Sequence, residues 1–93
     1  MREIERTRRF KRDYRREKSG PHGKKLDTLL LEALDLLAAD LPLPQRYVDH
    51  PLSGDWSGFR DCHIRPDLVL IYEKPDATTL RLVRLGSHSE LGF

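Results

Sequence analysis

The chain has 93 residues, 34% of them charged, and a formal net charge of +2. This length accommodates one hydrophobic core, so we expect a single domain over residues 1–93. No apolar run approaches the roughly 20 residues of a membrane span, and the first residues lack the apolar stretch of a secretory signal. A single cysteine, Cys62, excludes an intramolecular disulfide. We therefore expect a cytoplasmic protein without a membrane partner.

The positive charge is concentrated near the N-terminus. Residues 1–25 hold eleven Lys or Arg against four Asp or Glu, a net charge of +7, whereas residues 26–93 have a net charge of −5. Such a segment is either an ordinary solvated helix face or a surface that attracts polyanions. An anionic membrane is the weaker candidate, because the segment lacks a broad apolar face. The candidate residues for contact with a polyanion such as RNA are Arg8, Arg9, Lys11, Arg12 and Arg15.

The first half of the chain predicts a short strand and two helices. Residues 2–7 are typical of an edge strand. Thr7 is a candidate N-cap, and Phe10 and Tyr14 have the i, i+4 spacing of a narrow apolar stripe on a basic helix. Residues 24–39 repeat Leu and Ala at helical spacing, so we expect a second helix that packs in the core.

The second half predicts three strands in quick succession. Residues 59–65 alternate apolar and polar side chains, residues 67–74 form a continuous apolar run, and residues 78–86 follow a turn. A tight turn at residues 65–67 connects the first two strands. The fold class expected is α+β, with the order β-α-α-β-β-β and two helices packed on one face of an antiparallel sheet.

Polar residues are concentrated in the stretch "DHPLSGDWSGFRDCHIRPD", residues 49–67. It holds two of the four histidines and four of the fifteen acidic residues. His50 lies in the loop part, His63 on the following strand, and Asp67 just after the turn. His88 follows the last strand, which pairs antiparallel with the middle one. We therefore expect His63, Asp67 and His88 to converge at one end of the sheet.

Three other conspicuous residues have structural interpretations. His22 belongs to the loop between the helices, where a solvated side chain is expected. Trp56 is interpreted as an anchor that packs its loop on the sheet, in preference to a base-stacking residue. Cys62 alternates to the face opposite His63, so it is expected to be a small core residue and not a nucleophile.

Several histidines in one cleft provide both a base and an acid near neutral pH. Metal binding is the competing interpretation, but no HxH, HExxH or CxxC spacing is present, so no metal or other cofactor is expected. Cleavage of RNA needs a base for the 2′-hydroxyl, an acid for the departing 5′-oxygen and positive charge for the phosphate. The arginines considered for the phosphate are Arg84, Arg60 and Arg81, which are equally well explained as ordinary strand-surface residues.

The same residues resemble a known family. "YVDHPLSGDWSGFRDCHIRPDLVLIYEK" followed by "LRLVRLGSHSEL" is similar to the YafQ-type branch of the RelE superfamily of bacterial toxins. The likeness extends over nearly the whole chain. It rests on a DHPL box, a GxRDxHIxPD box and a GSH box in this order.

The resemblance implies a compact RelE-like ribonuclease fold and an mRNA interferase that cleaves messenger RNA in the ribosomal A site without a metal. The residues matching its functional positions are His50, His63, Asp67 and His88, with Arg84 at a phosphate-contacting position. The family also implies an antitoxin that binds and blocks the toxin. Members commonly carry an aromatic residue four positions after the last histidine, which helps to hold the substrate base. Here Gly92 takes that place and Phe93 follows one residue later, so Phe93 is the candidate for stacking on the base.

Two alternatives remain at this point. One is a non-enzymatic toxin on the same scaffold that binds a host target such as gyrase, although those relatives lack the histidine set. The other is a metal-dependent nuclease. The residues alone do not assign individual acid and base roles, because coupled groups in one cleft titrate together.

Overall fold

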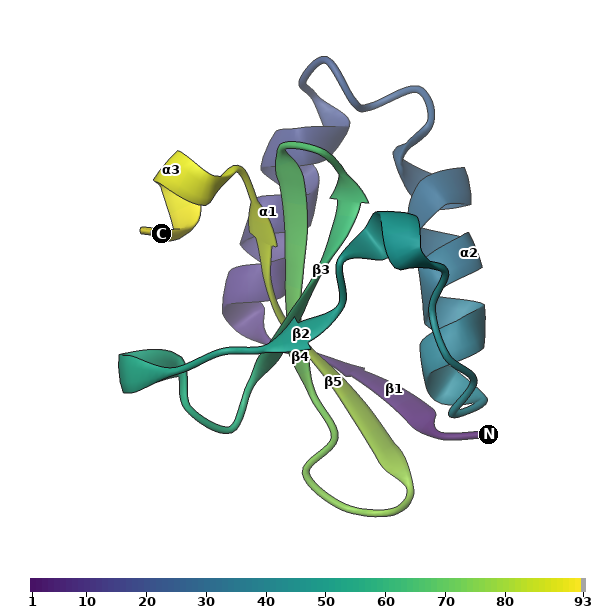
Figure 1. The fold of residues 1–93 in the computed structure, drawn as a ribbon. Helices are drawn as coiled ribbons and strands as arrows, with labels where there is room; N and C mark the ends of the chain where they lie inside the picture. The colour runs from purple at the N-terminus through teal and green to yellow at the C-terminus, as the bar shows by residue number, and fades with distance from the viewer. Residues whose placement is uncertain (93) are drawn as a thin grey trace.

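The computed structural model describes residues 1–92 and builds them around a five-stranded sheet in the order β1-β5-β4-β3-β2 (Figure 1). The strands are β1 (Glu3–Arg6), β2 (His50–Pro51), β3 (Arg60–Arg65), β4 (Leu68–Glu73) and β5 (Thr79–Gly86). The helices are α1 (Arg8–Lys18), α2 (Leu26–Ala38) and α3 (His88–Leu91), with short 3₁₀ helices at Gln45–Tyr47 and Gly54–Trp56. No helix in the described part of the chain is both long and apolar enough to cross a membrane.

The α+β fold class predicted from the sequence is confirmed. β3, β4 and β5 form the expected antiparallel meander. The sheet as a whole is mixed and not antiparallel as predicted, because the edge strand β1 pairs in parallel with β5. Two elements were not predicted. The two-residue strand β2 extends the sheet beyond β3, and α3 follows β5 directly.

The two long helices begin differently. Thr7 caps α1 as predicted, because its hydroxyl accepts a hydrogen bond from the backbone N–H of Phe10 at 3.1 Å. The residue before α2, Lys25, forms no side-chain cap. α2 is instead stabilised by its apolar stripe, in which Leu26, Leu30 and other residues are buried.

The two faces of the sheet differ in what covers them. The larger core lies between the sheet and both long helices, and includes Phe10, Leu30, Cys62 and Leu70. The opposite face carries a smaller cluster around Val69, Ile71 and Leu91, covered by α3 and the loop before β3. The expectation that both helices pack on one face is therefore confirmed, and the second face is left for polar side chains of β3.

A buried carboxylate connects α1 to β5. Asp13, 2% exposed, accepts hydrogen bonds from Arg84 Nε at 2.7 Å and from the backbone N–H of Leu85 at 3.0 Å. Arg16 also bonds Asp13 at 2.9 Å, and its guanidinium donates to the Leu85 carbonyl at 2.8 Å. This network holds the C-terminal end of β5, from which α3 begins, against α1.

Candidate active site

The sheet register brings the sequence-predicted residues to one end of β3, β4 and β5. His63 pairs with Val69 on β4, and Val69 pairs with Gly86 at the end of β5. Two residues after Gly86, His88 begins α3. Because pairing across adjacent strands places residues side by side, His63 and His88 meet although 25 positions separate them.

His63, Asp67 and His88 converge as predicted. The rings of His63 and His88 meet edge to face with centroids 5.1 Å apart. Asp67 lies in the turn between β3 and β4, and its Oδ1 atom is 2.9 Å from His88 Nδ1 and 3.2 Å from the backbone nitrogen of His88. His88 thus connects the other two residues.

Asp67 is an ionised partner for His88. Hydrogen bonds from the side chain and backbone of His88 lower the pKa of the Asp67 carboxyl, and the charge of His22 adds to this effect. His22 was interpreted as a solvated loop residue without a role; its loop lies at the same end of the molecule as the β3–β4 turn (Figure 1). Nothing in the sequence spacing indicates this proximity, since His22 and Asp67 are 45 positions apart and belong to different loops.

His50 reaches the cluster from the neighbouring strand. β2 pairs with β3 so that His50 lies opposite Asp61. His50 Nδ1 is 2.7 Å from the Val48 carbonyl oxygen and 3.1 Å from Asp61 Oδ1. Asp61 and His63 are two positions apart on β3 and therefore share a face, so His50 stands beside the pair of rings.

Asp61 is the residue that the sequence reasoning missed. The residue as a whole is 3% exposed. Burial raises its pKa, while the charges of His50, His63 and His88 act in the opposite direction. The sequence pattern that indicates its position is the alternation of side chains along the strand, which places Asp61 on the same face as His63 and opposite Cys62.

The three arginines considered for the phosphate all have acidic partners. Arg84 is bonded to Asp13 at 2.7 Å and only 19% of its side chain is exposed. Arg60 pairs with Asp49 at 3.3 Å. Arg81 pairs with Glu5 at 2.8 Å and with Glu73. Their contact with a substrate phosphate stays a prediction, and for Arg84 it requires exchange of a buried ion pair.

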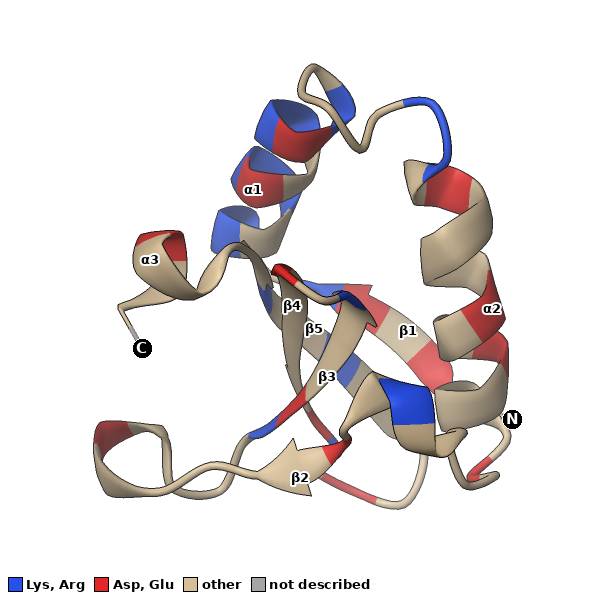
Figure 2. Ribbon diagram, turned by 45° about the horizontal axis from the view of Figure 1, so that its top comes forward, with Lys and Arg blue, Asp and Glu red and all other residues tan. Residues whose placement is uncertain are grey.

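The basic residues of α1 form an exposed cationic face. Figure 2 shows Lys and Arg along α1, whereas α2 carries only acidic charges. Within residues 1–92, none of the five residues proposed for RNA contact forms an ion pair: Arg8, Arg9, Lys11, Arg12 and Arg15. The proposed role of Phe93 falls on a residue outside the described part of the chain.

The interpretations of Trp56 and Cys62 are confirmed. Trp56 packs edge to face on Phe59, with ring centroids 5.4 Å apart, and contacts the smaller cluster under its loop. Cys62 is fully buried in the larger core. Burial raises the pKa of its thiol, which keeps it protonated and unreactive.

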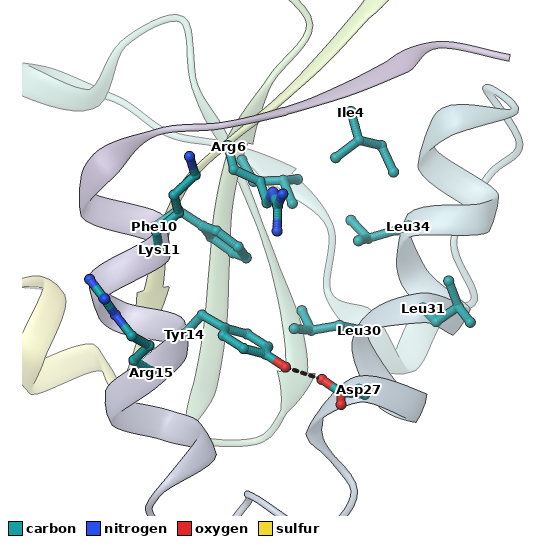
Figure 3. Close-up of a pocket in the computed structure, with 11 residues that line it drawn as sticks. Ile4, Arg6, Phe10, Lys11, Tyr14, Arg15, Asp27, Leu30, Leu31 and Leu34 are labelled. Atoms are coloured by element: carbon teal, nitrogen blue, oxygen red, sulfur yellow. Dashed lines mark hydrogen bonds between the residues drawn. The ribbon is translucent and has the colours of Figure 1, made fainter.

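A groove of about 660 Å³ lies between β1, α1 and α2. Figure 3 shows Phe10, Tyr14 and Leu30 directed into it, with Lys11 and Arg15 along the α1 side. The groove is associated with the helical layer, whereas the histidines project from the face of Val69 and Ile71. None of the described residues that line it is a histidine.

The candidate metal-ligating side chains of the histidine cluster contact one another in pairs, such as His50 with Asp61 and His88 with Asp67. Among the residues that the structure describes, no group of three or more His, Cys, Asp or Glu side chains is placed to hold a metal ion. The arrangement provides several titratable groups within proton-transfer reach of one another, one carboxylate that orients a histidine, and one that is buried.

The chain matches the family described as the bacterial toxin of type II toxin-antitoxin systems, YafQ, over residues 2–92. It is 40% identical over 95 residues to the mRNA interferase toxin YafQ of Escherichia coli strain B / BL21-DE3, covering 98% of this chain and 96% of the relative. The corresponding toxin of strain K12 is 50% identical over 56 residues, which span 60% of each chain.

Solved structures agree with these sequence matches. A copper-bound mutant toxin from Helicobacter pylori has a TM-score of 0.85 and 35% identity, covering 98% of this chain and 99% of that one. The toxin in the Escherichia coli DinJ-YafQ toxin-antitoxin complex has a TM-score of 0.78 and 36% identity, covering 97% of this chain and 96% of that one. With the family match extending from residue 2 to residue 92, the resemblance carried by the DHPL, GxRDxHIxPD and GSH boxes is confirmed: the chain belongs to the YafQ family of type II toxin-antitoxin toxins.

Proposed function

We propose that the chain is a toxin with endoribonuclease activity, an mRNA interferase that cleaves messenger RNA on the ribosome and so inhibits translation. The observation that carries the proposal is the convergence of His63, Asp67 and His88, with His50 beside them. The name "mRNA interferase toxin YafQ" of the aligned relatives supports it. Since the ribosome is its place of action, the toxin works in the bacterial cytoplasm.

The reaction is an intramolecular transesterification. A histidine accepts the proton of a 2′-hydroxyl while the 2′-oxygen attacks phosphorus. The bond from phosphorus to the 5′-oxygen breaks, and a protonated histidine gives its proton to that oxygen. His50, His63 and His88 share these roles as a coupled set, and their protonated forms also offset the charge that develops on the phosphate.

Asp67 orients His88 in this scheme. Its Oδ1 atom lies 2.9 Å from His88 Nδ1, so the neutral ring carries its proton on Nδ1 and has Nε2 as its basic atom. The tautomer follows from this hydrogen bond. When His88 is protonated, the Asp67 carboxylate stabilises the imidazolium.

The basic face of α1 supplies affinity for ribosomal RNA. The five exposed cations, which form no ion pair with the described acidic residues, favour contact with phosphates through counterion release. The proposal therefore assigns binding to α1 and chemistry to the end of the sheet.

A cognate antitoxin is the second partner. The toxin in the DinJ-YafQ toxin-antitoxin complex, a structural relative, supports this assignment. We place part of its binding surface in the groove between β1, α1 and α2, which has an apolar floor and the cationic rim residues Arg6, Lys11 and Arg15. Such a groove fits a segment with an apolar ridge and acidic flanks.

A metal-dependent nuclease is the second candidate, because solved relatives include a copper-bound toxin. The two are separated by cleavage in excess EDTA. Unchanged cleavage agrees with histidine acid–base chemistry, whereas loss of cleavage that returns with copper, zinc or manganese favours the metal.

The decisive experiment compares wild type with His63→Ala and His88→Ala. Each is expressed from a tightly controlled promoter, with growth and the 5′ ends of cellular mRNA as readouts. We expect growth arrest and in-frame cleavage with wild type, and strong impairment in each variant. Growth arrest without mRNA cleavage would favour the gyrase-type alternative, and equal toxicity of all three proteins would refute the catalytic assignment.

A further inference from the structure

Asp61 is a buried carboxylate in the middle of the histidine cluster. The reaction proposed above gives it no role. It is 3% exposed and lies opposite His50 in the pairing of β2 with β3. We propose that Asp61 is a positioning residue of the cleft, acting through His50 by stabilising the imidazolium that forms when His50 takes the proton of the 2′-hydroxyl. This inference rests on the proposed function.

A backbone carbonyl orients the His50 ring. Val48 O lies 2.7 Å from His50 Nδ1, so the neutral ring donates an Nδ1–H bond and leaves Nε2 free to accept a proton. Val48 has a φ of 47°, in the left-handed region that β-branched residues rarely adopt. Strained backbone of this kind persists where the surrounding structure requires it, as at working sites.

The charge next to this ring comes from Asp61. Its Oδ1 atom is 3.1 Å from the same Nδ1 atom, yet within residues 1–92 it accepts no hydrogen bond. A buried carboxylate oxygen without a donor is unfavourable unless a cation forms beside it. Protonation of His50 at Nε2 creates that cation, and the Nδ1–H group, which the neutral ring already directs at the Val48 carbonyl, becomes a charged and therefore stronger donor beside both acceptors.

The charged groups around Asp61 come from three elements and one loop. Burial raises the pKa of the Asp61 carboxyl, and the Asp49 carboxylate adds to this; His50 on β2, His63 on β3 and His88 on α3 lower it. The carboxylate is therefore costly in a neutral cluster and favourable in a protonated one. Because the proton arrives during the reaction, Asp61 lowers the energy of the state that follows proton abstraction more than that of the resting enzyme.

Asp61 keeps its charge and its protonation state throughout the cleavage reaction. The 2′-oxygen forms a bond to phosphorus as its proton passes to His50 Nε2. The bond to the 5′-oxygen breaks as a second protonated histidine supplies a proton. Asp61 neither gives nor takes a proton, and its charge only compensates that of His50.

Asp61→Asn tests this role because it keeps the shape and removes the charge. We expect single-turnover cleavage of ribosome-bound mRNA at saturating ribosome to slow by about 10- to 100-fold, with unchanged ribosome affinity. The acidic limb of the pH–rate profile moves to lower pH, since a neutral neighbour no longer favours the imidazolium. Asp35→Asn, which neutralises an exposed carboxylate on α2, is the matched control and keeps the wild-type rate and profile.

Two further variants test whether Asp61 acts through His50. Combined with His50→Ala, Asp61→Asn is expected to slow cleavage by less than about 2-fold, because its partner is gone. Combined with His63→Ala, it retains its full effect. Asp61→Ser, with a smaller neutral side chain, serves as a second variant, and circular dichroism checks that each protein is folded.

The outcomes separate the inference from the proposed function. The role of Asp61 is overturned if folded Asp61→Asn keeps the wild-type rate and pH profile. It is also overturned if Asp61→Asn slows cleavage as much in the His50→Ala background as in wild type. In both cases wild type remains an active nuclease. Absence of ribosome-dependent cleavage by wild type overturns the proposed function itself.

Discussion

His88 and Asp67 are bonded twice: Asp67 Oδ1 lies 2.9 Å from the ring Nδ1 of His88 and 3.2 Å from its backbone nitrogen. The two hydrogen bonds fix both the ring orientation and the start of α3 relative to the β3–β4 turn. A carboxylate with 70% of its side chain exposed has little to contribute to core packing. We therefore expect Asp67 to act by orienting His88.

Asp67→Asn is expected to reduce cleavage of ribosome-bound mRNA by about 10- to 100-fold, because the amide can turn its N–H toward Nδ1 and select the other tautomer. The thermal unfolding midpoint falls only slightly, since the residue is exposed and hydrogen bonds to an exposed carboxylate contribute little to stability. Single-turnover kinetics and differential scanning calorimetry measure the two effects. Asp55→Asn, an exposed carboxylate in the loop before β3, is the control; an equal loss there would contradict a specific role for Asp67.

Asp13→Ala is expected to destabilise the fold by about 3 kcal/mol, because it leaves Arg84 and the Leu85 N–H without their buried acceptor. Urea unfolding followed by circular dichroism measures this change. Asp76→Ala, at an exposed carboxylate near the β4–β5 connection, is the comparison. A destabilisation below about 1 kcal/mol would mean that water replaces the network.

The same carboxylate predicts the acid sensitivity of the fold. Burial raises the pKa of Asp13, but hydrogen bonds from Arg84 and Leu85 and the charges of Arg84 and Arg16 lower it overall. A lowered pKa contributes stability above the unfolded value of about 3.9, and this is lost as the pH falls through the folded value. We therefore expect Asp13→Asn to show a shallower loss of unfolding free energy below about pH 4 than wild type. Parallel curves from urea titrations would count against this.

Local sequence patterns were sufficient for the main elements of the fold. The Leu and Ala repeat predicted a helix over residues 24–39, and α2 occupies Leu26–Ala38. The meander was visible because its strands alternate or run apolar between turn residues. The sequence analysis did not predict α3, although Ser87 and Glu90 form a capping box at its start. A helix of four residues is too short to show a helical repeat of apolar residues.

The candidate site was predictable where it depends on strand register and not where it depends on distant partners. His63 and His88 could be brought together from the antiparallel order of β3, β4 and β5 alone. The pairing of His50 with Asp61 requires β2, which is only two residues long. The ion pair of Arg84 with Asp13 joins residues 71 positions apart, and strand periodicity does not distinguish such an arginine from one that awaits a phosphate.

Neutralising the basic face of α1 is expected to weaken ribosome binding without slowing cleavage at saturating ribosome. Arg8→Gln, Arg9→Gln and Arg12→Gln together remove three exposed cations, and the dependence of log K on log salt becomes shallower by about 1 for each phosphate that is no longer neutralised. Filter binding at several salt concentrations measures this. Arg46→Gln with Lys74→Gln removes charge from outside α1 and is the control, expected to keep the wild-type slope.

The groove between β1, α1 and α2 predicts where the antitoxin is sensitive to substitution. Leu31 lines the groove and is 59% exposed, so Leu31→Glu leaves folding intact but places a negative charge where we expect an apolar ridge with acidic flanks. Antitoxin affinity should fall at least about 10-fold by isothermal titration calorimetry, while cleavage by the free toxin is unchanged. Leu41→Glu, at a leucine 54% exposed outside the groove, should bind the antitoxin normally. The loss is expected because a carboxylate in the middle of an apolar interface must lose its hydration when the partner binds. If both variants bound the antitoxin equally well, its binding site would lie elsewhere.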